Sequence, residues 1–178
     1  MKRLAKQFGT SLVKALVLSP TLVKDLAELR AHGIKIRRVD NKLSNTFAES
    51  DPRKKIIYIG KNCPISYQLT AIAHEKYHVL TRLTPAADPN KIKRGQFVSE
   101  CFQCEMNATV HDLMVAGELQ AAGLEMDAHT LDLLTVYQTG GRRALRKRLS
   151  EATTSNTGQT YRAYYGQIWD DAEEALWV

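Results

Sequence analysis

Two histidines and a glutamate in the segment His74–His78 have the residue types and the spacing of a hydrolytic metal site. The segment reads His-Glu-Lys-Tyr-His, which is an HExxH motif. On a helix, residues i and i+4 lie on one face, so both imidazoles can reach a single metal ion. Glu75 lies about 100° round the helix from His74, where it can accept a proton from the attacking water instead of binding the metal. The motif therefore predicts metal ligands at His74 and His78, with Glu75 as the catalytic base.

The sequence around the motif favours a helix preceded by a strand. Apolar residues recur at mixed spacings of three and four, and neither glycine nor proline interrupts residues 65–83. Upstream, residues 55–59 are β-branched and aromatic and follow the turn signal Ser50-Asp51-Pro52. We therefore expect a strand, a short connection and then the helix that carries the two histidines.

A third metal ligand must come from another part of the chain, because catalytic zinc usually has three protein ligands and one open position. A second helical pattern runs from about residue 97 to residue 122 and stops at Gly123, a common residue directly after a helix. We predict Glu105 as the third ligand, because the small Ala108 on the same face allows the two helices to approach closely. The same helix offers these alternative ligands: Glu100, His111, Asp112, Cys101 and Cys104.

The order of these elements resembles the gluzincin branch of the zincin metallopeptidases. In that branch a glutamate from a second helix completes the site, and Glu105-Met106-Asn107-Ala108 is the matching segment here. The chain is also similar, over roughly residues 34–122, to small uncharacterised bacterial and phage proteins of metallopeptidase type with a Glu-x-x-Ala signature on that helix. The resemblance implies a Zn²⁺ ion bound by His74, His78 and Glu105, with Glu75 as the base and a protein or peptide as the substrate.

Two departures narrow this resemblance. The metzincin extension of the motif is absent, because Thr81 stands where that pattern needs glycine and Thr84 where it needs histidine. Lys76 occupies a position that is apolar in many members of the family, so its ammonium group must point away from the metal.

An outer nitrogen of one imidazole should bond to an acidic side chain, and Asp112 is a candidate for this role.

Length and composition indicate one globular domain. The chain has 178 residues, of which 44% are hydrophobic, enough for a core of its own. No apolar run approaches the length of a membrane span. The basic segment 2–17 favours an amphipathic helix over a signal peptide, so we expect a cytoplasmic protein or, alternatively, one exported by a specialised secretion system.

The three cysteines do not form the pattern of a disulfide framework. Their number is odd, and Cys101 and Cys104 fall within a predicted helix, so we expect a reducing compartment. No second Cys-x-x-Cys pair exists to complete a site of four cysteines. Buried packing is the expected role of Cys101 and Cys104, and redox sensing or a thiolate ligand is the alternative.

The net charge is +6, and its strongest basic cluster is the segment 142–148. We expect a solvated helix face whose charges pair with the acidic tail, residues 170–174. The alternative is attraction to nucleic acid, an acidic protein or anionic lipid. Since no nucleic-acid-binding motif accompanies the cluster, base-specific recognition is not indicated.

The whole pattern predicts an α+β fold, mostly helical and zincin-like, with about three strands beside the HExxH helix. The strands are expected at residues 34–39, 46–48 and 55–59. The chain would form a single domain, 1–178, with the metal-site core in 34–122 and a helical part in 123–178. In a fold of this kind an edge strand next to the active helix can bind an extended substrate.

The last predicted helix, about residues 160–177, is rich in aromatic residues. We expect them in the core or in the wall of a cleft, and one tyrosine is a candidate hydrogen-bond donor to an oxyanion. The helix carries Tyr161, Tyr164, Tyr165, Trp169 and Trp177.

The function most consistent with the sequence is that of a zinc-dependent metallopeptidase. An attacking water would lose its proton to Glu75, which then protonates the leaving amine. A secreted toxin or effector peptidase is one alternative, and an inert, basic binding protein for nucleic acid or an acidic partner is another. The sequence indicates neither the cleavage specificity nor the oligomeric state.

Overall fold

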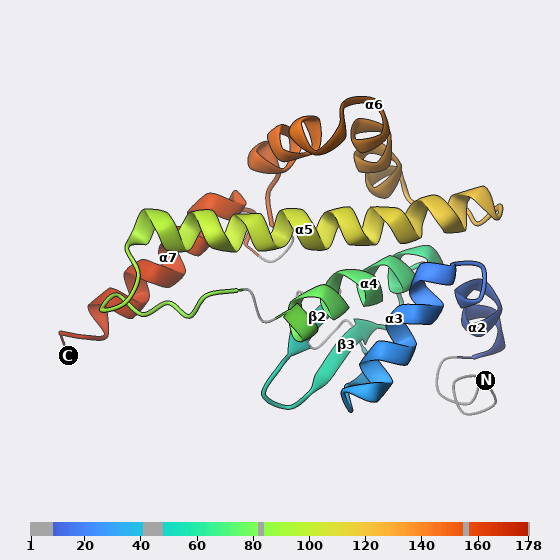
Figure 1. Cartoon of the computed structure of the whole chain (residues 1–178), viewed down its shortest axis with the longest axis horizontal. Coiled ribbons are helices and arrows are strands. Elements are labelled where there is room, and N and C mark those ends of the chain that lie inside the picture. The colour runs from blue at the N-terminus through green and yellow to red at the C-terminus, as the bar shows by residue number, and fades with distance from the viewer. Residues whose placement is uncertain (1–8, 41–47, 82–83, 155–156, 178) are drawn as a thin grey trace.

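The computed structural model describes residues 9–40, 48–81, 84–154 and 157–177, and its fold is α+β with helices predominating. Figure 1 shows the long helix α5 running horizontally through the molecule, with the small sheet below it. The elements in chain order are α2 (Thr10–Leu16), α3 (Pro20–Ala31), β1 (Lys35–Val39), β2 (Ala48–Asp51), β3 (Ile56–Gly60), α4 (Ile65–Thr81), α5 (Arg94–Ala121), α6 (Ala128–Glu151) and α7 (Tyr161–Glu174).

The sheet has three strands in the order β1-β3-β2, with β1 parallel and β2 antiparallel to β3. Strand composition explains this order. The central strand β3 reads Ile-Ile-Tyr-Ile-Gly and is buried at four of its five positions, as expected for a strand with neighbours on both sides and a covered face. The edge strand β2 reads Ala-Glu-Ser-Asp, and its polar side chains suit an exposed edge.

Two of the three strand predictions are confirmed, and the middle one is shifted. We expected a strand at 46–48, of which 46 and 47 lie outside the described residues, whereas β2 continues to Asp51. Asp51 was predicted to belong to a turn, but it pairs with Ile56 in the sheet. The turn itself covers residues 52–55, and Asp51 stabilises it by accepting a hydrogen bond from the backbone N–H of Lys54 at 2.9 Å.

Helices of the structure begin, end or bend at residues that cap or break helices. Ser19 caps α3 by accepting a hydrogen bond from the Leu22 N–H, with Pro20 in the first turn. Gly123 follows α5 with a φ of 85°, and Gly141 interrupts α6 with a φ of 62°. Of the predicted helix at 2–17, residues 1–8 lie outside the described part, and the remainder forms α2.

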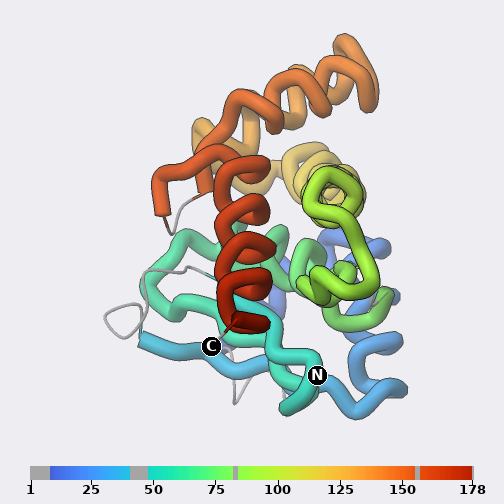
Figure 2. Tube along the Cα trace, turned by 90° about the vertical axis from the view of Figure 1, so that its left-hand side faces the viewer, coloured from blue at the N-terminus to red at the C-terminus, as the bar shows by residue number. Residues whose placement is uncertain are grey.

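The main core lies between the sheet and the helices α4 and α5. Buried residues of β3 and α4, including Ile57, Leu69 and Ile72, pack together with Leu119 of α5. Smaller clusters lie beneath α6 and beneath α7. Figure 1 shows α7 crossing α5 near one end, with most of α7 on the side of α5 where the sheet lies, and Figure 2 shows α7 beside α5. Helix α4 is thus enclosed by the sheet on one side and α5 on the other.

The buried cysteines are confirmed as packing residues. Cys101 is 0% exposed and Cys104 is 5% exposed, and neither forms a disulfide bond. Burial raises the pKa of the Cys101 thiol to about 12, so this side chain stays neutral. None of the helices in the described ranges combines the length and the apolar character that crossing a bilayer requires.

The predicted pairing of the basic cluster with the acidic tail is wrong. Arg148 pairs with Asp132 of the same helix at 2.9 Å, while Arg142 and Arg146 donate to amide oxygens of α5. In the tail, Asp170 pairs instead with Arg94 at 2.6 Å. The kink at Gly141 directs the basic half of α6 back along α5, so its cations meet α5 and not the end of α7.

Candidate metal centre

Helix α4 presents two imidazoles, and helix α5 supplies a carboxylate to the same point. The Nε2 atoms of His74 and His78 are 3.2 Å apart. Glu105 approaches them with Oε2 at 3.4 Å from His74 Nε2 and Oε1 at 3.5 Å from His78 Nε2. The structure therefore brings the three predicted ligands together, and their ligand atoms lie within 4.8 Å of one another.

These separations suit a zinc ion. Ligand atoms that lie about 2.0–2.1 Å from zinc at the corners of a tetrahedron are roughly 3.3 Å apart. The two Nε2 atoms, 3.2 Å apart, match that value, and each has an oxygen of Glu105 at a similar distance, Oε2 at 3.4 Å from His74 and Oε1 at 3.5 Å from His78. Two imidazole nitrogens and one carboxylate also form a donor set that zinc accepts. The residues thus fit the metal that the sequence predicts.

Two further side chains contact the predicted ligands. His74 Nδ1 is 2.8 Å from Asp112 Oδ2, which leaves Nε2 facing Glu105 and His78. Tyr165 Oη donates a hydrogen bond to Glu105 Oε1 at 2.5 Å. The candidate role of Asp112 is confirmed as a contact. The role of Tyr165 was not predicted, because no local pattern distinguishes it from the neighbouring tyrosines of α7.

Burial and charge set the protonation of this cluster. Burial opposes ionisation of Glu105, but the hydrogen bonds from His74 and His78 outweigh it and hold the pKa of Glu105 well below its usual range. Burial and the charge of Glu105 raise the pKa of Tyr165 far above its ordinary value. Glu105 is therefore a carboxylate, and Tyr165 keeps its proton as a hydrogen-bond donor.

The alternative third ligands lie away from the cluster or serve it in another way. Glu100 is exposed and accepts a hydrogen bond from Gln96. His111 Nε2 contacts Asp25 of α3 at 2.7 Å. Among the described residues, the three that can hold one metal ion together are His74, His78 and Glu105.

Lys76 points away from the metal cluster, as predicted. Its Nζ lies 2.9 Å from Asp25 Oδ1 and 2.6 Å from Glu28 Oε2, both on α3. Asp25 is only 2% exposed and also contacts His111. The cation inside the motif therefore anchors α4 to α3 and leaves the metal face of α4 free of positive charge from this side chain.

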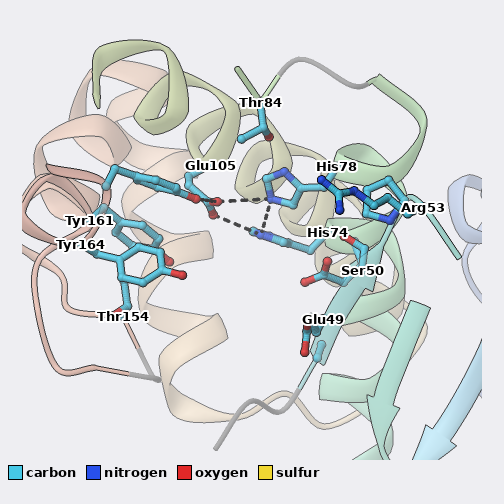
Figure 3. A pocket seen from close by; sticks show the side chains of 14 residues that line it. Glu49, Ser50, Arg53, His74, His78, Thr84, Glu105, Thr154, Tyr161 and Tyr164 are labelled. Carbon is cyan, nitrogen blue, oxygen red and sulfur yellow. Dashed lines mark hydrogen bonds and ion pairs between the residues drawn. The ribbon is translucent and has the colours of Figure 1, made fainter. Parts of the chain in front are cut away.

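The metal cluster faces a cleft of about 870 Å³. One wall is strand β2 with the turn that follows it, and the other wall is α7, as Figure 3 shows. Glu75 borders this cleft together with the three ligands. Tyr161 and Tyr164 project into it from α7, across from Glu49 and Ser50. The predicted base and the predicted ligands therefore share one cleft.

A smaller hollow of about 350 Å³ adjoins the cleft on the side of Glu75. Ala48, His74, Glu75 and Tyr161 border both spaces. Its apolar walls come from Leu113, Leu133 and Leu149, which are all buried. The hollow therefore extends the cleft past Glu75 toward the buried leucines of α5 and α6.

Comparisons with protein-family models, curated proteins and solved structures found no match for this chain.

Proposed function

We propose that this protein is a zinc-dependent metallopeptidase of gluzincin type, with a zincin-like arrangement of its sheet and metal helices. The observation that carries the proposal is the convergence of His74, His78 and Glu105 beside Glu75, in a cleft large enough for a peptide. The substrate is a protein or peptide, either in the cytoplasm or in a cell to which the protein is delivered as an effector.

Each residue of the centre has a separate role in the proposed reaction. A bound Zn²⁺ would act as a Lewis acid, lowering the pKa of a water molecule and polarising a carbonyl group. Glu75 accepts the proton of the attacking water and transfers it to the leaving amine. Asp112 and Tyr165 hold His74 and Glu105 in place. Tyr161 and Tyr164 face the cleft and are the candidates for hydrogen bonding to the oxyanion.

The cleft suits an extended peptide. Strand β2 is an edge strand, and Ala48, Glu49 and Ser50 line the cleft along it. The outer edge of a sheet offers unpaired N–H and C=O groups to an added strand. A peptide bound along β2 would pass between this strand and the tyrosines of α7, with one of its carbonyl groups close to Glu75.

Metal analysis combined with a cleavage assay tests the proposal. The purified chain should contain one zinc ion, and His74→Ala should remove it. The wild-type chain should cleave components of a proteome-derived peptide library, and a chelator should stop this cleavage. A chain that binds zinc stoichiometrically but cleaves no peptide would overturn the peptidase assignment.

A basic binding protein without activity is the second candidate. The observation in its favour is that Arg142 and Arg146 bond to the neutral amides of Asn107 and Gln103, and neither arginine forms an ion pair with another residue in the part of the chain that the structure describes. Binding to nucleic acid through such charges would weaken steeply with added salt. Affinity of that kind in a chain without cleavage activity would favour this second function.

A further inference from the structure

Arg53 places a positive charge at the edge of the cleft. It lies in the turn between β2 and β3 and lines the same cleft as His78 and Glu75. Figure 3 shows Arg53 on the His78 side of the cleft, across from Tyr161 and Tyr164. Among the described lining residues of this cleft, Arg53 is the one lysine or arginine.

The charge of Arg53 is not neutralised within the described part of the chain. Its neighbour Lys54 pairs with Asp51 at 3.0 Å, and no ion pair joins Arg53 to another described residue. Asp51 also accepts the Lys54 N–H, so it fixes the turn that carries Arg53. Of the three consecutive cations in the turn, Arg53, Lys54 and Lys55, Lys54 pairs with Asp51, whereas Arg53 is the one that lines the cleft.

We propose that Arg53 binds a carboxylate of the substrate at the His78 end of the cleft. The carboxylate belongs either to an aspartate or glutamate side chain or to the C-terminus of the peptide. A guanidinium group donates two parallel hydrogen bonds to a carboxylate, which gives both affinity and a defined orientation. This inference rests on the proposed peptidase function and specifies the substrates that the cleft selects.

The other charges of the cleft are consistent with this assignment. Glu105 is occupied by the two histidines and Tyr165, and Glu75 is the proposed base. Glu49 is the remaining acid in the lining, and Figure 3 shows it on β2 at a distance from the His78 side. A substrate carboxylate near Arg53 therefore meets a cation without facing Glu49 directly.

Matched peptides test the inference. A site cleaved in the library is resynthesised in four forms: with internal glutamate or glutamine, and with a free or amidated C-terminus. The ratio of kcat/KM for acidic and neutral forms should be about 10–100 for one of the two pairs, since a hydrogen bond to a charged group contributes about 1.5–3 kcal/mol. The pair that shows the ratio identifies the source of the carboxylate.

Variants of the turn assign the preference to Arg53. Arg53→Gln should bring the ratio close to one, whereas Lys54→Gln, which changes a cation outside the cleft lining, should preserve it. The same contrast should appear in peptide binding to a Glu75→Gln chain, measured by fluorescence anisotropy, where turnover plays no part.

The outcomes separate this inference from the proposed function. A zinc-loaded wild-type chain that cleaves no peptide overturns the peptidase function and the inference with it. A chain that cleaves acidic and neutral forms equally, prefers basic residues, or keeps its acidic preference in Arg53→Gln overturns the inference alone.

Discussion

His74 Nδ1 and Asp112 Oδ2 form a contact of 2.8 Å that joins α4 to α5, on the side of the imidazole away from Glu105. The two nitrogens of a histidine are distinct, and a partner at one nitrogen determines which nitrogen remains for a metal. Because Asp112 takes Nδ1, Nε2 is directed toward Glu105. The contact thus links the approach of α4 and α5 to the orientation of His74, a proposed ligand.

Asp112→Asn should weaken zinc binding by about 10–100-fold, because the side chain keeps its shape but loses the charge that orients His74 and increases its basicity. A competition titration against a chromophoric chelator measures this change. Asp132→Asn is the matched control, since Asp132 pairs with Arg148 on the surface of α6. Equal zinc affinities for Asp112→Asn and wild type would show that Asp112 does not support the metal centre.

Tyr165→Phe should also weaken zinc binding, by roughly 10–100-fold. The substitution removes the hydroxyl that donates to Glu105 at 2.5 Å, and a hydrogen bond to a charged group contributes about 1.5–3 kcal/mol. The same titration applies. Tyr164→Phe is the control, because Tyr164 packs against Tyr165 with ring centroids 5.1 Å apart and faces the same cleft. The prediction fails if the two variants bind zinc alike.

Glu75→Gln should retain zinc but reduce kcat by about 10²–10⁴-fold, the usual contribution of a general base. Glutamine fills the same space and cannot accept the proton of the attacking water. Elemental analysis and peptide cleavage on one preparation measure the two effects separately. Glu100→Gln, at an exposed position of α5, should leave both unchanged, and full activity in Glu75→Gln would exclude the proposed base.

The local part of the site could be predicted from the sequence, because helix periodicity alone places His74 and His78 on one face. Glu105 required one further step, namely that the helix with Ala108 packs closely against α4. The helix ends were also predictable, since glycine and proline mark them. The three strands were predictable too, except that β2 continues to Asp51. Whether the fold is zincin-like stays a prediction.

Long-range contacts could not be predicted in this way. Tyr165 meets Glu105 across 60 positions of sequence, and its spacing on α7 does not distinguish it from Tyr161 or Tyr164. The acidic tail and the basic half of α6 have opposite charges, but the kink at Gly141 separates them. Charge patterns indicate that partners exist, whereas the path of the backbone determines which partners meet.

A buried carboxylate on α3, Asp25, contacts both α4 and α5. It contacts Lys76 of α4 at 2.9 Å and His111 of α5 at 2.7 Å. Lys76 follows the proposed base, and His111 precedes Asp112 in the chain. Burial opposes ionisation of Asp25, but the hydrogen bonds from His111 and Lys76 outweigh it, so the pKa of Asp25 lies below its usual value of 3.8.

Asp25→Asn should lower the free energy of unfolding by on the order of 3 kcal/mol at pH 7, because Lys76 would remain partly buried without its closest buried anion. Since the folded-state pKa of Asp25 is depressed, its contribution is fully present above about pH 4 and is lost as the pH falls through the folded-state value. Denaturant titrations at pH 7 and pH 3 should therefore show a large difference from wild type at pH 7 and a smaller one at pH 3. Glu28→Gln, which removes the exposed partner of Lys76, should cost less than about 1 kcal/mol. An equal loss at both pH values in Asp25→Asn would mean that packing, and not charge, accounts for the effect.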